Sequence, residues 1–589
     1  MNIIGLSAFY HESACCLLQN GRLVAAASEE RFSRVKHDPR LPVQAFRYCL
    51  RAGGLSLPDV DVVAYYESPV KKLSRQLWAG LPQGDEELAW LDPQQPERAI
   101  RERLGYDGPI WFFDHHQSHA ASAFFYSGFR DAAIFTVDGV GEWATTTYGR
   151  GEAAALEVFE EVRFPHSLGL LYATITSYLG FRVNNGEYKV MGLAPYGEPR
   201  FVDQIHTLLE DGPGGQYTLE MDYFDFVRGR RMFAPALCDV FGALPRVPES
   251  AITPFHCDVA RSVQVVLEEI LLSKVRYLAG RVDTDNLCMA GGVALNCVAN
   301  GRIVREGPFE RLFVQPAAGD AGGCLGAAAL AHLQHTGRRH SNEPLAHVFL
   351  GPRFDTGEVA SILAATGLPA RDFRHREADL LEAVVDRLVQ HQVVGWFHGA
   401  MEFGPRALGA RSILANPLDP DIRDRLNAMI KKREAFRPFA PSVLAEHAAD
   451  HFALDHPSPF MLETCRVASS LALPGITHVD GSARPQTVDR VHNPRFAALL
   501  EAFYRRTGCP MLINTSFNVR GEPIVCTPAD ALWCMGRSGL DALVLEDFLI
   551  DRVMLPDTWE PLLAAWQGRR RSAFSQRKSA IEESLYTFV

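Results

Sequence analysis

Residues 1–28 read MNIIGLSAFYHESACCLLQNGRLVAAAS and contain three apolar runs, at 3–7, 14–19 and 23–27. The last two runs are separated by an Asn-Gly pair, which is a strong signal for a β-hairpin when apolar runs flank it. The start of the chain is therefore predicted to form a strand, a turn and a two-stranded hairpin.

A similar unit recurs at residues 133–148, which read AIFTVDGVGEWATTTY. An apolar run at 133–137 is followed by the tight turn Asp-Gly-Val-Gly and by a Thr-rich run at 144–148 that is typical of a strand. Two strand–turn–strand units predict a duplicated fold. A chance resemblance between two hairpins is the alternative, because hairpins are common.

The remaining patterns alternate between strands and helices, which indicates an α/β protein. Helical spacing is found at 116–126, 259–278, 294–304, 321–332, 358–366 and 379–391, and short buried strands are predicted at 286–290 and 393–397. A Gly-, Pro- and polar-rich stretch at 336–357 indicates a linker. We therefore expect a first domain at 1–345, a second at 346–560 and a C-terminal tail at 561–589.

The composition narrows the class of protein. The 589 residues are 47% hydrophobic and 22% charged with a net charge of −11, which argues against a general nucleic-acid binder or a polybasic membrane protein. The 12 cysteines form no CxxC pair, so reduced thiols are expected. Neither a signal peptide nor a sufficiently long apolar stretch is evident, and we expect a soluble cytoplasmic protein.

The spacing of two histidines indicates a candidate metal site. His115 and His119 are four residues apart in a predicted helix that Asp114 would cap, so they share one face. This pair is equally consistent with metal ligands and with core histidines. Asp138, at the end of a predicted strand, and Asp320, at a predicted helix start, favour the metal site. Two histidines and two aspartates suit Zn²⁺ or Fe²⁺ better than Mg²⁺.

Glycine-containing turns at three places suggest phosphate cradles, because glycine lets backbone N–H groups approach an anion. These turns contain Ser7, Gly139 and the pair Gly291-Gly292. None fits a Walker A or Rossmann motif. Each one alone is more commonly explained by packing, whereas three in one domain favour nucleotide or phosphate binding.

Basic residues gather in the C-terminal half, in runs rich in Gly and Pro. Arg406 and Arg411 lie in FGPRALGARS, and Lys432 and Arg437 in KKREAFRPF. Because guanidinium groups match phosphate and carboxylate, these runs predict an anion pocket. A solvated helix face is the alternative for residues 431–433.

Further donors without negative charge would complete such a pocket. They are Arg484, Asn514, Ser516 and Asn518. Asn and Ser clusters also form ordinary turns, so this part of the prediction depends on the arginines.

Together these motifs resemble the O-carbamoyltransferase family of the nodulation and cephamycin type. The matching stretches are GLSAFYHESA from residue 5, SEERFSR from 28, HHQSHAASA from 115, YKVMGLAPYG from 188, AGGVALN from 290, PRALGARS from 405, KREAFRPFAP from 432 and NTSFN from 514. They cover nearly the whole chain in the order of the family. The run at 185–189 is a looser version of the family's pattern, which puts the role of Glu187 in doubt.

The resemblance implies an actin/Hsp70-like duplicated N-terminal domain and a YrdC-like C-terminal domain. It also implies that carbamoyl phosphate and ATP, with Mg²⁺, yield carbamoyladenylate and pyrophosphate in the C-terminal pocket. The carbamoyl group then passes to a hydroxyl group at the N-terminal metal site. By the same resemblance His115, His119, Asp138 and Asp320 bind the metal, with iron expected first and zinc second.

The resemblance also implies nucleotide or phosphate contacts by Lys189 and Asn296. His11 follows the first glycine turn, and its neutral imidazole is a candidate base for the acceptor hydroxyl, whereas a hairpin histidine that only bonds the backbone is the alternative. The catalytic set of the C-terminal pocket would be Arg406, Lys432 and Arg437.

The expected partner is a hydroxylated small molecule of antibiotic or other secondary metabolism, without nucleic acid or membrane. Two other functions remain open. One is a tRNA threonylcarbamoyl-type transferase, which the net charge of −11 disfavours. The other is an actin-like nucleotide-binding protein without transfer chemistry, which leaves the C-terminal basic residues unexplained. The acceptor and the oligomeric state are left open.

Overall fold

The computed structural model describes residues 1–80, 91–229, 231–431, 433–556 and 559. The chain divides into two compact units. The first comprises residues 1–33 and 37–345, and the second comprises 34–36 and the described residues from 346 onwards. The tail predicted at 561–589 lies outside the described residues.

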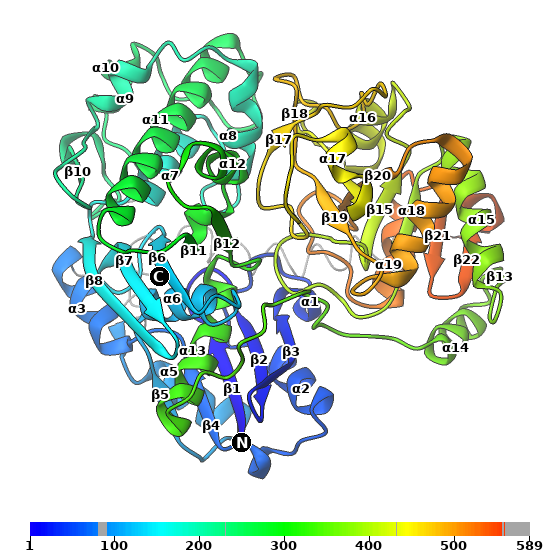
Figure 1. Cartoon of the computed structure of the whole chain (residues 1–589), viewed down its shortest axis with the longest axis horizontal. Coiled ribbons are helices and arrows are strands. Elements are labelled where there is room, and N and C mark those ends of the chain that lie inside the picture. Colours follow the sequence, from blue (N-terminus) through cyan, green and yellow to red (C-terminus); the bar gives the residue numbers. More distant parts are fainter. Residues whose placement is uncertain (81–90, 230, 432, 557–558, 560–589) are drawn as a thin grey trace. The chain divides into compact units, whose positions relative to one another are not determined.

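Two five-stranded sheets frame the first unit (Figure 1). One has the order β3-β2-β1-β4-β5 and is built from β1 (Asn2–Ser7), β2 (Ala14–Gln19), β3 (Arg22–Ser28), β4 (Val62–Tyr65) and β5 (Ile110–Phe112). The other has the order β8-β7-β6-β11-β12 and is built from β6 (Asp131–Val137), β7 (Ala144–Glu152), β8 (Ala155–Arg163), β11 (Asn286–Ala290) and β12 (Arg311–Val314).

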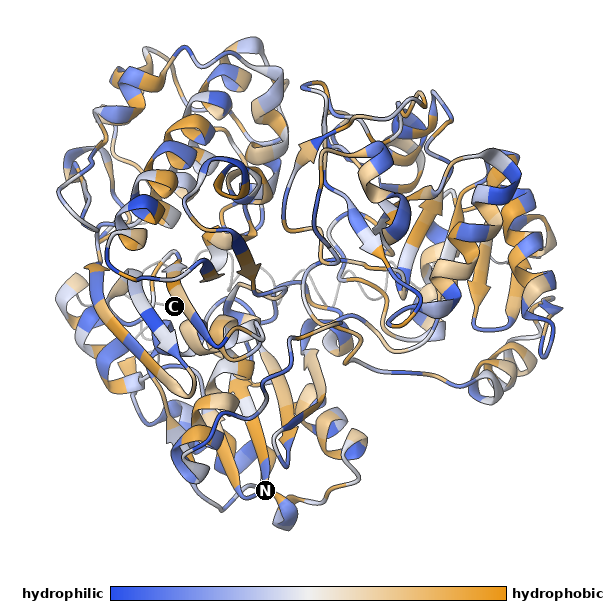
Figure 2. Cartoon of the chain, viewed as in Figure 1, coloured by the Kyte–Doolittle hydropathy of each residue, from blue (hydrophilic) through white to orange (hydrophobic). Residues whose placement is uncertain are grey.

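The two sheets repeat one topology. In each, the central strand runs antiparallel to the strand that follows it and parallel to the fourth strand of its half. The same strand order and the same directions confirm the predicted duplication and give this unit its actin-like architecture. Figure 2 shows that apolar residues predominate in the strands β1 and β2.

Helices α6 (His115–Phe124) and α13 (Asp320–Thr336) occupy equivalent places, because each follows the fifth strand of its half. Helix α6 packs on β6, β7 and β11, whereas α13 packs on β1, β2 and β4, and the two helices contact each other. Their backbones approach closely at Gly326, where a Cβ atom would lie 1.8 Å from the carbonyl oxygen of Ser118. The first residues of both helices are thereby held in the interior of the unit.

The other elements of the first unit surround these two sheets. They are α1 (Glu30–Ser33), α2 (Val43–Ala52), α3 (Pro69–Ala79), α5 (Gln95–Ala99), α7 (Leu168–Tyr178), α8 (Glu187–Leu193), α9 (Val202–His206), β9 (Leu209–Glu210), β10 (Thr218–Leu219), α10 (Ala236–Phe241), α11 (Pro254–Ala279) and α12 (Cys297–Glu306). Helix α12 starts three residues later than the predicted helix at 294, because residues 292–295 form a 3₁₀ turn.

The second unit contains an eight-stranded mixed sheet of order β13-β22-β21-β14-β15-β20-β16-β19. Its strands are β13 (Arg371–Asp372), β14 (Val394–Phe397), β15 (Arg411–Ala415), β16 (Ala440–Leu444), β19 (Gln486–Val488), β20 (Met511–Ser516), β21 (Ala542–Leu545) and β22 (Phe548–Asp551). A two-stranded ribbon of β17 (Cys465–Arg466) and β18 (Ser482–Ala483) accompanies it.

Six helices complete the described part of this unit. They are α14 (Thr356–Thr366), α15 (Glu377–Val389), α16 (Ile422–Arg425), α17 (Ala448–His451), α18 (Pro494–Thr507) and α19 (Pro528–Arg537). The α/β class predicted for both halves of the chain is confirmed. That the second unit is YrdC-like stays a prediction.

Strand register brings distant segments to one end of the large sheet. Phe397, the last residue of β14, pairs with Arg411, and the neighbouring Ser412 pairs with Ser516 at the end of β20. The starts of β16 and β19 lie at this same end, because Ala440 pairs with Asn514 of β20 and β19 runs parallel to β16. We call it the β14 end of the sheet.

Two further expectations can be compared with the structure. All 12 cysteines are free, as predicted. Within the described ranges, no helix combines the length and the apolar character that are needed to cross a membrane.

Candidate functional site

Four side chains converge in the first unit, two from α6, one from the turn after β6 and one from the first residue of α13. One ligand atom of each of His115, His119, Asp138 and Asp320 lies within 4.8 Å of the others. The Nε2 atom of His115 is 3.0 Å from His119 Nε2, 3.0 Å from Asp138 Oδ2 and 3.6 Å from Asp320 Oδ1. All four residues are buried. We call them the four-ligand cluster.

The geometry of this cluster fits a single metal ion. Ligand atoms bound at about 2.0–2.2 Å to one ion lie roughly 3–3.5 Å apart, and most of the separations above fall close to that range. The Oδ2 atom of Asp320 is buried and has no hydrogen-bond partner among the described residues. A bound cation would compensate this oxygen, and the mixed nitrogen and oxygen donors suit Zn²⁺ or Fe²⁺.

Electrostatics of the cluster also favour a cation. Burial disfavours the imidazolium of His115, yet the charge of Asp320 and a hydrogen bond to Asp138 raise the pKa of His115 to about 9. Although Asp138 is buried, hydrogen bonds from the two histidines hold its pKa well below the usual range. Burial and the charges of nearby carboxylates raise the pKa of Asp320. Without a cation, protons on His115 and Asp320 offset the buried carboxylate charge, and a bound cation can take the place of these protons.

A buried glutamate that the sequence analysis missed fixes the start of α6. Glu142 Oε1 accepts hydrogen bonds from the backbone N–H groups of His115 at 2.9 Å and of Ser68 at 2.6 Å. Asp114 occupies the predicted N-cap position, but its side chain makes no capping bond and pairs with Lys71 at 2.6 Å. The predicted capping role of Asp114 is therefore wrong, because Glu142 takes the place of its carboxylate.

The glycine turn at residues 291–292 positions one residue of the four-ligand cluster. The N–H group of Gly292 donates to Asp138 Oδ1 at 2.8 Å and orients this ligand. Gly291 has φ +96°, and a Cβ atom there would lie 2.2 Å from the carbonyl oxygen of Val137. For these two glycines the structure supports a packing and positioning role.

Ser7 is the last residue of β1, and Gly139 lies two residues after the end of β6. The Ser7 hydroxyl accepts from the Ala14 N–H at 3.1 Å, and the Gly139 carbonyl accepts from Ser167 Oγ at 2.6 Å. Both residues therefore carry contacts that close their turns. Phosphate binding by either residue stays a prediction.

The remaining predicted residues of this unit have different surroundings. The Asn296 side chain caps α12 by accepting from Ala299 N–H at 3.1 Å and exchanges hydrogen bonds with Gln264, so we assign it a structural role. Lys189 lies on α8 with its Nζ 5.4 Å from the Phe181 ring centroid. The Nε2 atom of His11 lies 2.8 Å from the Asn184 carbonyl oxygen.

In the second unit, a buried lysine joins two predicted residues. The Nζ group of Lys431 donates to the Ser516 carbonyl oxygen at 2.6 Å and to Asn518 Oδ1 at 2.7 Å. Burial and the nearby charge of Arg433 lower the Lys431 pKa well below its usual value. The predicted Lys432 lies outside the described residues. In the sequence, the apolar neighbour Ile430, which is buried like Lys431 itself, was the signal for a buried position.

Arg411 holds loop backbone in this structure, and its predicted anion contact stays a prediction. Its guanidinium is fully buried, lies 3.6 Å from the Phe397 ring centroid and donates to the carbonyl oxygens of His398, Gly399 and Pro352. The group is thus used to hold loop backbone, and the sequence could not show that this side chain points inward.

Asn514 is likewise used inside the sheet, where its Nδ2 group donates to Ser442 Oγ at 2.9 Å and Gln486 Oε1 at 3.0 Å. Arg484 stands just before β19 at the β14 end and has no hydrogen-bond or ion-pair partner among the described residues. It is the predicted arginine that is best placed to receive an anion.

Two more predicted arginines flank strands of this sheet. Arg406 is half-buried in the loop between β14 and β15. Arg437 lies just before β16, with its guanidinium 3.8 Å from the Glu434 carboxylate. The register therefore gathers three predicted arginines, Ser516 and Asn518 at the β14 end.

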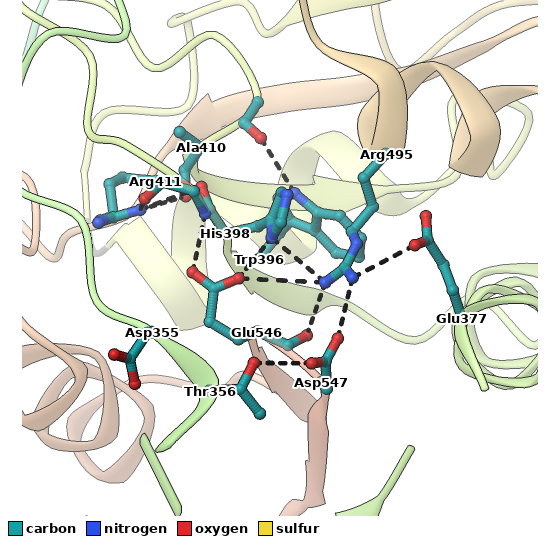
Figure 3. A network of polar contacts seen from close by, with 12 residues as sticks. Asp355, Thr356, Glu377, Trp396, His398, Ala410, Arg411, Arg495, Glu546 and Asp547 are labelled. Atoms are coloured by element: carbon teal, nitrogen blue, oxygen red, sulfur yellow. Dashed lines mark hydrogen bonds and ion pairs between the residues drawn. The ribbon is translucent and has the colours of Figure 1, made fainter. Parts of the chain in front are cut away.

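A polar network that the sequence did not reveal braces the same end (Figure 3). His398 follows β14 and Glu546 follows the parallel neighbour β21, and His398 Nδ1 lies 2.6 Å from Glu546 Oε2. The second carboxylate oxygen accepts from Gly399 N–H at 2.8 Å. Arg495 donates to Asp547 Oδ1 at 2.9 Å, and Thr356 donates to the other oxygen of Asp547 at 2.7 Å.

The comparison with known protein families agrees with this arrangement. Residues 2–80 and 99–329 match the family described as Carbamoyltransferase N-terminus, and residues 385–552 match Carbamoyltransferase C-terminus. The chain is thus an enzyme of the carbamoyltransferase family, which excludes the alternative of a nucleotide-binding protein without transfer chemistry.

Two relatives cover most of the chain, and a third matches less than half of it. An uncharacterized protein of Synechocystis sp. is 45% identical over 94% of this chain and 97% of its own length. The nodulation protein NolNO of Sinorhizobium fredii is 37% identical over 94% of this chain and 81% of its own length. A 3'-hydroxymethylcephem-O-carbamoyltransferase of Amycolatopsis lactamdurans is 38% identical over 44% of this chain and 48% of its own length.

Proposed function

We propose that this protein is an ATP-dependent O-carbamoyltransferase. It takes the carbamoyl group from carbamoyl phosphate, activates it as carbamoyladenylate and transfers it to a hydroxyl group of a small-molecule natural product. The four-ligand cluster of His115, His119, Asp138 and Asp320 carries this proposal, because it provides a buried cation site in a member of the carbamoyltransferase family. The name of the cephem O-carbamoyltransferase supports a hydroxylated small molecule as acceptor.

In the transfer step, which belongs to the first unit, the acceptor hydroxyl oxygen bonds to the carbamoyl carbon of carbamoyladenylate and AMP leaves. A divalent metal, Fe²⁺ or Zn²⁺, held by the four-ligand cluster would polarise the carbamoyl carbonyl group. Glu142 and Gly292 hold His115 and Asp138 in place through backbone and side-chain hydrogen bonds. His11 is the proposed acceptor of the hydroxyl proton, and because its Nε2 faces a carbonyl oxygen, Nδ1 is its basic atom.

The activation step belongs to the second unit. Water first hydrolyses carbamoyl phosphate to carbamate and inorganic phosphate. The carbamate oxygen then attacks the α-phosphorus of ATP, so that a C–O–P linkage forms and pyrophosphate leaves. We place Arg406, Arg437 and Arg484 on the phosphate groups, with Mg²⁺ accompanying ATP, since guanidinium groups pair with phosphate oxygens through two parallel hydrogen bonds.

Lys431 adds a buried amino group beside Ser516 and Asn518, and phosphate groups bound next to it would favour its protonated form. Its position next to two residues that were predicted to bind phosphate gives it the role first expected of Lys432. A positive charge in a poorly solvated site stabilises a leaving pyrophosphate more strongly than the same charge in water.

The test is pyrophosphate release by the purified protein. We expect release only when both ATP and carbamoyl phosphate are present, and carbamate formation only when a hydroxylated acceptor from a panel of natural products is added. Pyrophosphate release that depends on threonine and bicarbonate, followed by transfer to tRNA, would instead establish the tRNA-modifying alternative.

A further inference from the structure

A second group of ligating side chains lies in the first unit. His11 and Glu12 belong to the turn between β1 and β2, and His37 follows α1. One ligand atom of each lies within 4.8 Å of the other two, and the two imidazole rings stack with their centroids 4.7 Å apart. We propose that these three residues form a second binding site for a transition-metal ion, separate from the four-ligand cluster.

Hydrogen bonds orient both imidazoles for this purpose. His11 Nε2 lies 2.8 Å from the carbonyl oxygen of Asn184, and His37 Nε2 lies 3.3 Å from Oδ1 of Asn185. Because these oxygens accept hydrogen bonds, each Nε2 carries a proton, which leaves Nδ1 of each ring as the atom that can bind a metal. Histidines that bind metals typically donate their other N–H group to an oxygen in this manner.

One of these Nδ1 atoms contacts the neighbouring carboxylate. His37 Nδ1 lies 3.2 Å from Glu12 Oε1, and a proton on Nδ1 makes this contact a hydrogen bond when no metal is bound. A cation bound by both atoms would take the place of that proton. The backbone supports the placement, because His37 has φ +54°, an uncommon conformation for a residue other than glycine.

The donor set indicates the kind of ion. Two imidazoles and one carboxylate suit Zn²⁺ or Fe²⁺, whereas Mg²⁺ and Ca²⁺ prefer oxygen ligands. Three protein ligands leave coordination positions open, as in catalytic metal sites. The side chains of His37 and Glu12 are 25% and 27% exposed, so that an ion can enter from solvent.

The site adjoins the four-ligand cluster without sharing a ligand. The second oxygen of Glu12 faces Gly319, where a Cβ atom would lie 3.4 Å away, and Gly319 directly precedes Asp320. A bound ion would occupy the Nδ1 atom of His11 that accepts the proton in the proposed transfer, so the second site is expected to be empty while transfer takes place. The second site goes beyond the proposed transferase function, and its test measures bound metal rather than activity.

The experiment loads the metal-free full chain with Zn²⁺ and measures zinc per chain by elemental analysis after equilibrium dialysis. We expect two ions in the unchanged protein, one in His37→Ala, one in His119→Ala and none in the double variant. His335→Ala, at an exposed histidine of α13, is the matched control and should keep two.

Two further variants keep the test decisive if His37→Ala does not fold by circular dichroism. Glu12→Gln keeps the side-chain volume and should lose the second ion. Asn185→Ala removes only the hydrogen-bond acceptor and should weaken the second zinc affinity by about 10–100-fold. A single ion in the unchanged protein that His119→Ala abolishes, or two ions retained in Glu12→Gln, would overturn the second site and leave the transferase proposal intact.

Discussion

His119 supplies one of the two nitrogen ligands of the four-ligand cluster and is fully enclosed by protein. Replacing it with alanine removes a ligand and leaves Asp138 and Asp320 without a compensating charge. We expect His119→Ala to lose the metal of this cluster and the transfer of carbamoyl to acceptor, while pyrophosphate release continues at the original rate. Elemental analysis and a pyrophosphate assay measure the two effects.

The matched control is His206→Ala, because His206 is 45% exposed and pairs only with Glu269 on the surface. It should change neither the metal content nor the rates. Full metal occupancy of the cluster in His119→Ala would contradict the assignment.

Arg437 lies at the start of β16, beside the carboxylate of Glu434. Lysine at this position keeps the charge but loses the two-pronged hydrogen bonding of guanidinium, which contributes about 1.5–3 kcal/mol in charged hydrogen bonds. We expect Arg437→Lys to release pyrophosphate roughly tenfold or more slowly.

Arg490→Lys, on an exposed arginine that pairs with Glu446 and Glu501, is the control for this substitution. It should keep the original rate. If Arg437→Lys also keeps that rate, Arg437 does not contact the reacting phosphates.

At the scale of elements, the close crossing of α6 and α13 positions three of the four ligands. A side chain at 326 would meet the backbone of Ser118, so Gly326→Ala must push the helices apart. We expect a loss of about 1–3 kcal/mol in stability and a metal affinity reduced at least roughly tenfold.

Gly337→Ala tests the specificity of that effect. Gly337 ends α13 with φ +68°, and a Cβ atom there would meet no other atom within 4 Å, so the substitution costs backbone strain alone. We expect a loss of about 1 kcal/mol and unchanged zinc affinity. Equal metal affinities in the two variants would show that the helix crossing does not position the ligands.

Helix α6 also depends on Glu142 for its first turn. Glu142→Ala leaves the N–H groups of His115 and Ser68 without their buried acceptor, and we expect a loss of about 1–3 kcal/mol in urea unfolding. Asp114→Ala removes only a surface ion pair with Lys71 and should cost at most about 0.5 kcal/mol. A larger loss in Asp114→Ala would restore Asp114 as the functional cap.

Local patterns predicted the ligands that stand at the ends of regular elements. His115 and His119 were found by helical spacing, and Asp138 by its place after a strand. The Lys431 amino group donates a hydrogen bond to Ser516, which is 85 residues away in the chain. No local sequence pattern could therefore pair these two residues. Arg411 was assigned to an anion pocket because the sequence does not show which way a guanidinium points.

At the scale of the whole molecule, the two sets of candidate residues belong to different units of the chain. The candidate metal ligands lie in the first unit, and the arginines proposed to bind phosphate lie in the second. The duplicated sheet of the first unit was predictable because its hairpin signal occurs twice. The eight-stranded sheet of the second was not, since its neighbouring strands come from distant segments.

This division predicts separable half-reactions. Arg406→Ala should not form carbamoyladenylate from ATP and carbamoyl phosphate, because a phosphate contact is lost. It should still transfer the carbamoyl group from synthetic carbamoyladenylate to the acceptor at the rate of the unchanged protein, measured by chromatography of the product. Loss of both activities in a folded variant would show that the two units do not work as independent catalysts.

The repeated halves of the first unit contribute unequally to the four-ligand cluster. The half built on β1–β5 and α6 supplies both nitrogen ligands, and the half built on β6–β8, β11, β12 and α13 supplies both oxygen ligands. The structurally equivalent first residues of α6 and α13 are His115 and Asp320. Two identical ancestral halves would have presented the same residue at both positions. The present set of candidate ligands is therefore a product of divergence after duplication, and neither half by itself contains the complete cluster.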